Sequence, residues 1–205
     1  MFISFEGIDF CGKSTQIDLL NDYLVEQGKK VEIVREPGGT TLSEMIRAIL
    51  LDNKNDKMLK ETELFLFSAS RAQLVRDKIR PYLEKGFYVI SDRFHDSSTA
   101  YQGYGRGIPV EVIADVHNLA IGDTIPEITF FIDIPVGIAN GRKKKKSKGK
   151  LDRIELADIE FYTRVRNGYL ETSKNEKRFK VIDGTQSIQH IHNHIISEFE
   201  LIDKR

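Results

Sequence analysis

The sequence predicts an α/β fold in which helices cover both faces of a five-stranded parallel sheet. Short apolar runs alternate with longer amphipathic segments along the whole chain, and this order is typical of parallel strands joined by crossover helices. The length of 205 residues, with 40% hydrophobic and 30% charged side chains, fits one globular domain. We therefore expect a single domain over residues 1–205.

Five apolar runs have the length and composition of buried strands. In chain order they are Phe2–Phe5, Val31–Val34, Phe87–Ser91, Ile128–Ile134 and Phe179–Asp183. The segments between them carry apolar residues at helical spacing. We expect helices over Lys13–Gln27, Thr41–Leu51, Glu61–Glu84, Val110–Ala120, Glu155–Thr172 and Ser187–Phe199. Because ligands of parallel sheets bind at the carboxyl ends of the strands, the residues that directly follow strands are the first candidates for function.

Charge and cysteine content narrow the class of protein. Lys+Arg and Asp+Glu both number 31, so any binding of polyanions should be local. The single Cys11 rules out an internal disulfide and fits a reducing compartment. The sequence shows no signal peptide and no apolar run of membrane-spanning length. We expect a cytoplasmic protein with no membrane or nucleic-acid partner.

A phosphate-binding loop follows the first expected strand. The pattern G-x-x-x-x-G-K-S is formed by Gly7, Gly12, Lys13 and Ser14, and a helical segment comes next. Its backbone N–H groups can wrap a polyphosphate, Lys13 can reach the β- and γ-phosphates, and the Ser14 hydroxyl can bind Mg²⁺. The expected ATP contacts are Gly7, Ile8, Asp9, Phe10, Cys11, Gly12, Lys13, Ser14 and Thr15.

Such a loop occurs in several classes of protein. A GTPase would need Asp-x-x-Gly after the third strand, and the guanine-type sequence NKND at Asn53–Asp56 comes too early in the chain. A motor ATPase would show an apolar run ending in two acidic residues, whereas FYVISDR ends in Asp92 and Arg93. A small-molecule kinase remains, and its acceptor site should be visible elsewhere.

Six short motifs occur in one order between residues 5 and 155: FEGIDFCGKST, REPGGT, LFLFSASR, SDRF, SSTAYQG and LDRIE. In these motifs the sequence resembles the bacterial thymidylate kinases, which are P-loop nucleoside monophosphate kinases. The resemblance implies the P-loop kinase fold, transfer of the ATP γ-phosphoryl group to thymidine 5′-monophosphate (dTMP) with Mg²⁺, and a homodimer.

The resemblance also implies a pocket for the thymine base and its sugar. Phe67 offers a flat apolar face on which a base can stack. Arg71 can donate to a thymine carbonyl, and Ser98 and Gln102 can complete the reading of the base edge. Tyr101 would leave no room for a 2′-hydroxyl. Taken alone, Phe67 would be read as a core residue; only the joint pattern favours a base pocket.

A second group of matching residues would hold the acceptor's phosphate and sugar. Asp9 corresponds to the carboxylate that meets the sugar 3′-hydroxyl. Arg47 and Arg93 would bind the phosphate, which suits a guanidinium group. Asp92 would orient Arg93 or a Mg²⁺-bound water, and Glu36 is a further acceptor-side candidate. Without the resemblance, Asp92 and Arg93 could be only an ion pair at a strand end.

The lid of such kinases is expected at residues 142–153, where Lys143–Lys150 holds six lysines in eight residues. The kinases that this sequence resembles carry a catalytic arginine either in the phosphate loop, just after its aspartate, or in the lid. Because Phe10 follows Asp9 here, the resemblance implies that the lid supplies the catalytic positive charge. Arg142 and Arg153 are the candidate catalytic arginines. Lys146 would support them, and Glu155 would fix Arg153. The run could instead be a solvated loop, a nuclear-localisation signal or a lipid-binding segment.

Thr185 follows the last strand, where the resemblance places the loop that lines adenine. Two other functions stay open. The chain could be another pyrimidine nucleotide or nucleoside kinase, or a nucleotide-binding module without catalysis that binds nucleic acid through its lysines.

Overall fold

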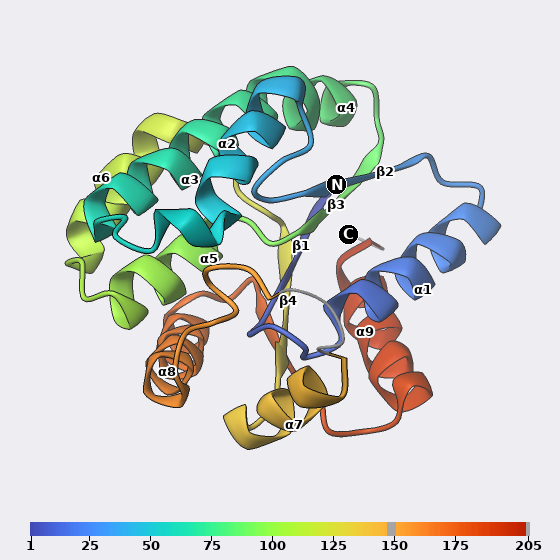
Figure 1. Ribbon diagram of the computed structural model, residues 1–205. Coiled ribbons are helices and arrows are strands. Elements are labelled where there is room, and N and C mark those ends of the chain that lie inside the picture. The colour runs from blue at the N-terminus through green and yellow to red at the C-terminus, as the bar shows by residue number, and fades with distance from the viewer. Residues whose placement is uncertain (147–150, 204–205) are drawn as a thin grey trace.

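The computed structural model describes residues 1–146 and 151–203, and the side chain of Lys146 lies outside this description. Five parallel strands form one sheet in the order β2-β3-β1-β4-β5 (Figure 1). The strands are β1 (Phe2–Glu6), β2 (Val31–Arg35), β3 (Tyr88–Asp92), β4 (Ile128–Asp133) and β5 (Phe179–Asp183). The predicted fold class is confirmed, and each strand lies within a residue of its predicted bounds.

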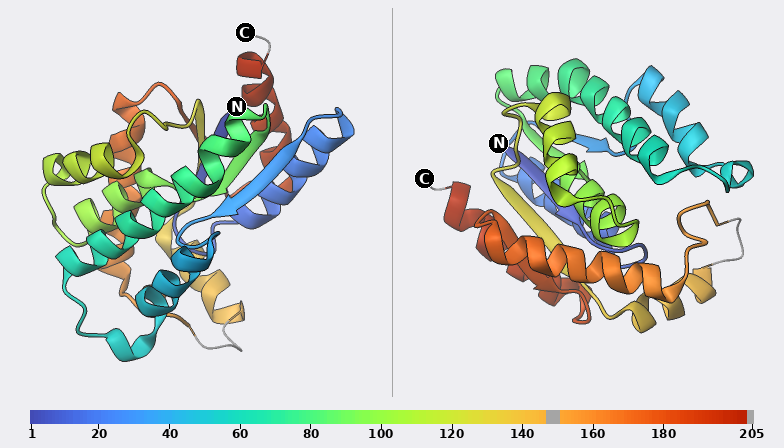
Figure 2. Two further views of the ribbon diagram at one scale, coloured as in Figure 1. Left: turned by 90° about the horizontal axis from the view of Figure 1, so that it is seen from above. Right: turned by 90° about the vertical axis from the view of Figure 1, so that its left-hand side faces the viewer.

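Helices form a layer on each face of this sheet (Figures 1 and 2). The helical elements of the described chain are α1 (Lys13–Glu26), α2 (Thr41–Leu51), η1 (Asn53–Asn55), α3 (Lys60–Leu74), η2 (Val75–Ile79), α4 (Arg80–Glu84), α5 (His95–Ser98), η3 (Thr99–Gly105), α6 (Val110–Ile121), α7 (Val136–Lys146), α8 (Ile159–Asn175) and α9 (Ile188–Asp203). Helices α1 and α9 pack together on one face, and α3, α6, η3 and α8 lie on the other.

The middle of the sheet forms the core. All residues of β1 are buried, since both faces of this central strand are covered. Phe5 packs against Phe130 of β4 with ring centroids 5.2 Å apart. Phe131 stacks on Tyr169 of α8 at 4.9 Å. This packing holds the end of β1, and with it the loop that follows, in one position against α8.

Several helical segments differ from the sequence prediction, and η1, α5 and η3 were not predicted as helices. The segment expected as one helix over Glu61–Glu84 is continuous but includes the π-helical turn η2. Helix α8 begins at Ile159 rather than Glu155, because Asp158 caps it by accepting a hydrogen bond from the Phe161 backbone N–H at 2.7 Å. The first lysines of the expected lid belong to α7, which lacks a regular apolar face; lysine itself favours a helix.

Candidate active site

A cavity of about 660 Å³ opens at the carboxyl ends of the strands, within the size range of small-molecule sites. It runs from the phosphate loop to α3 and η3 in one direction and to the segment after β5 in the other. Sixteen of the expected site residues line it: Asp9, Phe10, Cys11, Gly12, Lys13, Ser14, Thr15, Glu36, Arg47, Phe67, Asp92, Arg93, Ser98, Tyr101, Gln102 and Arg142. Gly7, Ile8, Arg71, Arg153 and Thr185 do not line it.

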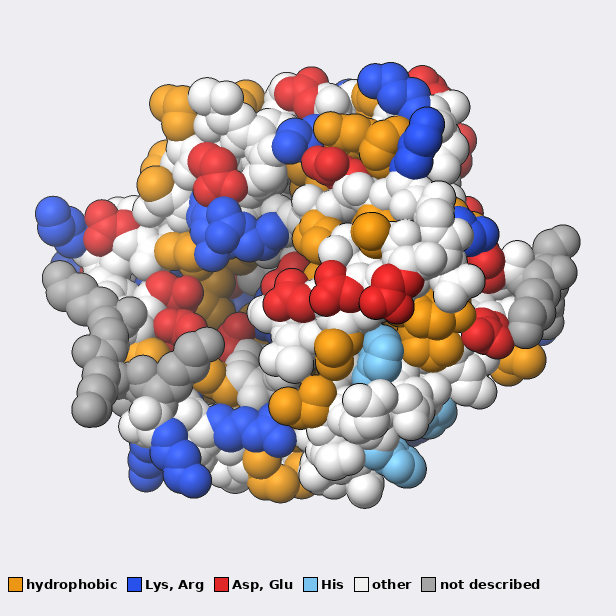
Figure 3. Space-filling model, turned by 90° about the vertical axis from the view of Figure 1, so that its right-hand side faces the viewer, with side chains coloured by type: hydrophobic (Ala, Val, Ile, Leu, Met, Phe, Trp, Pro, Cys, Tyr) orange, Lys and Arg blue, Asp and Glu red, His pale blue; other side chains and the backbone are white. Residues whose placement is uncertain are grey.

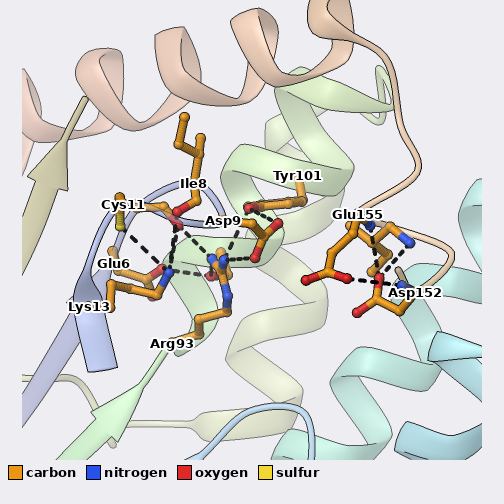
Figure 4. Close-up of polar contacts among 12 residues, drawn as sticks. Glu6, Ile8, Asp9, Cys11, Lys13, Arg93, Tyr101, Asp152 and Glu155 are labelled. Atoms are coloured by element: carbon orange, nitrogen blue, oxygen red, sulfur yellow. Dashed lines mark hydrogen bonds and ion pairs between the residues drawn. The ribbon is translucent and has the colours of Figure 1, made fainter. Parts of the chain in front are cut away.

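The phosphate loop connects β1 to the N-terminus of α1. Gly7 has φ +143°, and a Cβ there would lie 2.7 Å from the Ile132 carbonyl oxygen, so only glycine fits. Lys13 turns back over the loop, with its Nζ 3.2 Å from the Gly7 oxygen and 3.4 Å from the Ile8 oxygen (Figure 4). The ammonium group therefore lies inside the curve of the loop, where a polyphosphate would be held.

Asp9 and Arg93 form the polar centre of the cavity. The Arg93 Nη2 donates to Asp9 Oδ1 at 2.7 Å, and the Tyr101 hydroxyl donates to Asp9 Oδ2 at 3.2 Å (Figure 4). The Tyr162 hydroxyl donates to the same oxygen at 2.9 Å. Burial alone would raise the pKa of Asp9, but Arg93, Lys13 and Tyr162 together hold it below its usual value. Asp9 is thus an ionised acceptor.

Strained backbone conformations occur close to Asp9 and Arg93. Among the described residues other than glycine, only Phe10 and Arg93 have positive φ, at +65° and +72°. Side chains rarely adopt this region, and such strain gathers at functional sites. At Arg93 a hydrogen bond from Nη1 to the Gly7 oxygen, 2.8 Å long, joins β3 to the phosphate loop.

Glu6, the last residue of β1, is a site residue that sequence reasoning missed. Its carboxylate is fully buried and accepts from the Phe94 backbone N–H at 2.7 Å, the Ser97 hydroxyl at 2.6 Å and the Tyr169 hydroxyl at 2.7 Å. Burial, reinforced by Asp96, raises its pKa to about 6. Glu6 ties the loop after β3 and helix α8 to the base of the phosphate loop. The available signal was an acidic residue at the end of an apolar strand.

The expected base pocket is built on α3 and η3. Phe67 is half-buried and lines the cavity, as a stacking platform would. Arg71 lies behind the wall, only 1% exposed, and its Nε donates to Glu36 at 2.6 Å while its Nη2 donates to Ser98 at 3.1 Å. Its Nη1 is buried and unpartnered within the described chain. Burial raises the pKa of Glu36 to about 7, even beside Arg71.

A second buried carboxylate, Glu63 of α3, was also missed. It is 1% exposed and accepts from the Gln102 Nε2 at 2.8 Å and from Arg106 at 3.2 Å. The Arg153 Nη1 lies 2.7 Å from its other oxygen. Burial would raise the pKa of Glu63, but Arg106, Gln102 and Arg153 outweigh it and lower this pKa. Glu63 gave little signal, because its three partner residues are distant in the sequence.

The two candidate lid arginines are placed differently. Arg142 of α7 reaches the phosphate loop, where its Nη1 donates to the Phe10 and Cys11 oxygens at 3.2 and 3.0 Å, and its Nη2 donates to the Gly184 oxygen at 3.2 Å. Arg153 pairs with Glu63 and donates from Nε to the Leu50 oxygen at 2.9 Å. The structure therefore does not bring Arg153 to the phosphates, since a buried carboxylate attracts it instead.

Two smaller expectations are corrected. Glu155 does not fix Arg153 by an ion pair; its carboxylate accepts from the Asp152 backbone N–H at 2.9 Å. Thr185 points at Asp183, to which its hydroxyl donates at 2.6 Å, and its neighbours Gly184 and Gln186 line the cavity. Residues 147–150, the rest of the lysine run, lie outside the described residues.

Ser14 and Asp92 are the residues that could hold Mg²⁺. Both line the cavity, and no hydrogen bond to either side chain is found in the described chain. No group of three or more His, Cys, Asp or Glu suited to a metal occurs there either. This sparse set fits Mg²⁺, which commonly takes one or two protein ligands and completes its shell with phosphate oxygens and water.

The surface on the side that α1 and α9 cover carries charges of both signs in separate places. Acidic side chains form a row across the middle, and basic side chains lie apart from it (Figure 3). Within residues 1–146 and 151–203, no helix has the length and apolar character needed to cross a membrane.

Comparison with known proteins identifies the family. A family model described as thymidylate kinase matches residues 5–195. The chain is 52% identical to the thymidylate kinase of Thermosipho africanus, with 98% of each covered, and 48% identical to that of Kosmotoga olearia, with 100% of this chain and 98% of the relative covered. The crystal structure of thymidylate kinase from Ehrlichia chaffeensis superposes with a TM-score of 0.80 at 38% identity, covering 98% of both chains. The chain belongs to the thymidylate kinase family.

Proposed function

We propose that this chain phosphorylates dTMP to the diphosphate with ATP and Mg²⁺. The observation that carries the proposal is one continuous cavity, lined by the phosphate loop, by residues of α3 and η3 and by residues that follow β5. Phe67 and Gln102 line the part that we assign to the acceptor base, which we call its recess, and Gly184 and Ile188 line the part that we assign to adenine. A nucleotide in each part would place its phosphates over the loop, as transfer between two nucleotides requires.

In this mechanism the protein positions the reactants and neutralises charge. The backbone of the phosphate loop and Lys13 hold the ATP phosphates. Arg93 and Arg47, both at the cavity wall, hold the phosphate of dTMP. Arg142 of α7 donates to the loop backbone, and this supports a role for it in stabilising charge on the migrating group. Ser14 and Asp92 would hold Mg²⁺, which would supply further positive charge to the phosphates.

The acceptor site also accounts for sugar and base. Asp9 is ionised and can accept from the sugar 3′-hydroxyl, and Tyr101, held beside it, restricts the space at the sugar. The base would stack on Phe67. Arg71 lies behind the wall with a buried, unpartnered Nη1, so its donation to a thymine carbonyl would require a side-chain movement on binding. A free nucleoside would leave Arg47 and Arg93 without their anion, so a monophosphate is the better acceptor.

The test is ADP production from ATP–Mg²⁺ with dTMP, dUMP, dCMP, the ribonucleotides and free thymidine supplied separately. We expect fast turnover with dTMP and little with ribonucleotides or thymidine. A Lys13→Met variant, which keeps the side-chain length but removes the charge, should lose at least about 100-fold in kcat. Preference for another monophosphate would contradict the base assignment. ATP binding without any turnover would contradict the kinase and make salt-dependent DNA binding the next assay.

We also propose a homodimer in the cytoplasm. Leu42, Met45 and Ile49 lie at helical spacing on α2 and are 49%, 63% and 48% exposed, which supports a contact with a second copy. The only cysteine, Cys11, is buried and free, which suits a reducing compartment. Light scattering on a gel-filtered sample should give twice the 23.5 kDa chain mass; a monomer at micromolar concentration would contradict the dimer.

A further inference from the structure

The Glu63 carboxylate is an obligate acceptor beside the expected base pocket. Its Oε1 accepts from Gln102 and Arg106, and its Oε2 lies 2.7 Å from Arg153 Nη1 and 3.3 Å from Arg106 Nη2. Two guanidinium groups keep this buried group ionised. An ionised carboxylate has no proton to donate, so every neighbour that bonds to it must be a donor.

This chemistry determines the orientation of the Gln102 carboxamide. A glutamine side chain has a donating NH₂ end and an accepting oxygen end, and either end could in principle face Glu63. Because Glu63 only accepts, the NH₂ end must point to it, at 2.8 Å. The other end of the carboxamide, the Gln102 Oε1, then points away from Glu63. Gln102 lines the cavity, and among the described residues no donor reaches its Oε1.

A fixed acceptor at this position selects for a ring N–H. The N3 atom of thymine or uracil carries a proton and would satisfy Oε1. The N3 atom of cytosine is itself an acceptor, so two lone pairs would face each other and neither would be satisfied in a buried pocket. A site built to hydrogen-bond one group strongly rejects the analogue that lacks it.

We propose that Glu63 is a specificity-determining positioning residue that makes the base pocket reject cytosine by holding the Gln102 oxygen toward the cavity. The inference rests on the proposed function, because it assumes that a pyrimidine base occupies the recess formed by Phe67 and Gln102. Glu63 itself touches no substrate. Its effect passes entirely through the one carboxamide that it orients.

The experiment compares kcat/KM for dTMP and dCMP in the wild type and in the variants Glu63→Gln, Gln102→Leu and the double variant. A glutamine at position 63 can accept or donate, so the Gln102 amide becomes free to turn. We expect the preference for dTMP over dCMP to fall about 10- to 100-fold in Glu63→Gln. In the Gln102→Leu background the same change should alter the preference no further. Glu61→Gln, an exposed change on the same helix, is the matched control.

Each outcome decides the proposal. An unchanged preference in folded Glu63→Gln overturns it, as does a Glu63→Gln effect on the preference that persists in the Gln102→Leu background. If Glu63→Gln does not fold, Gln102→Leu decides alone: a lost preference supports the proposal and a retained one overturns it. If the wild type fails to phosphorylate dTMP, the proposed function fails. Calorimetric binding of dTMP and dCMP to the same variants then tests the Glu63 proposal separately, with the same expected ratio.

Discussion

At the scale of single residues, the cavity wall and the layer behind it contain charges that are already paired within the protein. Asp9 with Arg93, Glu36 with Arg71 and Glu63 with Arg153 are ion pairs of 2.6 to 2.7 Å, and the last two are almost fully buried. Removing one member of such a pair leaves an uncompensated charge, which costs about 3–5 kcal/mol of stability. Substitution of an apolar contact residue leaves no unpaired charge, so its effect on substrate binding can be separated more clearly from its effect on stability.

Phe67→Ala is such a change. The base would lose a stacking surface worth about 1–2 kcal/mol, so we expect the KM for dTMP to rise about 10-fold while the KM for ATP stays constant. Steady-state kinetics with each substrate varied in turn measures both values. Phe65→Ala is the control, because Phe65 lies on the same helix and is 61% exposed. An equal rise of both KM values would show that Phe67 supports the fold rather than the base.

At the scale of the elements, the two lid arginines lie on different parts of the chain, one on helix α7 and one after it. Arg142 lies on α7 over the phosphate loop, whereas Arg153 is held at the end of α2 by Leu50 and by Glu63. A positive charge acts on the reaction only if it lies near the oxygens where charge develops. Position on these elements, rather than charge alone, distinguishes the two residues.

Arg142→Ala should therefore lower kcat more than Arg153→Ala does, by about 10-fold or more. Arg153→Ala should mainly lower stability, seen as a fall in the midpoint of thermal unfolding, because Glu63 loses one of its two guanidinium partners. Parallel kinetics and melting curves of the two variants make the comparison. A larger kcat loss in Arg153→Ala would show that this side chain leaves Glu63 when substrates bind, and would restore it as the catalytic arginine.

The helices and strands also differ in how well the sequence could predict them. The strands were predicted because they are short runs rich in apolar residues, and the phosphate loop because its spacing is fixed by the ligand. Helix α7 was missed, since GIANGRKKKK has no apolar period. The partners of Glu6 and Glu63 were missed for another reason. Glu6 bonds to Tyr169, 163 positions away, and such pairs form only when the sheet and its helices are assembled.

At the scale of the whole molecule, buried titratable groups make stability depend on pH in two opposite ways. Burial lowers the pKa of His95 to about 4 and of His117 to about 2, from 6.5 in the unfolded chain. The unfolded state thus takes up these protons first, and stability falls as pH falls below 6.5. Burial raises the pKa of Glu6 to about 6 and of Glu36 to about 7, from 4.5. These two take up protons first in the folded state, so they favour folding as pH falls from 7 to 4.5.

Between pH 6.5 and 4.5, the effects of the two histidines and the two glutamates on stability nearly cancel. Below pH 4.5 the effect of His95 and His117 is the larger, so stability falls. His117 faces His95 at 5.3 Å between ring centroids and is repelled by Arg71, so its protonation in the fold is strongly disfavoured.

His117→Leu removes this proton uptake from the unfolded state. We expect the variant to lose less stability on acidification than the wild type, by about 1.4 kcal/mol per pH unit between pH 6 and 3. Urea unfolding at a series of pH values measures this slope, with His190→Leu on the exposed face of α9 as the control. Parallel curves for His117→Leu and the wild type would mean that this histidine already takes up its proton in the folded state.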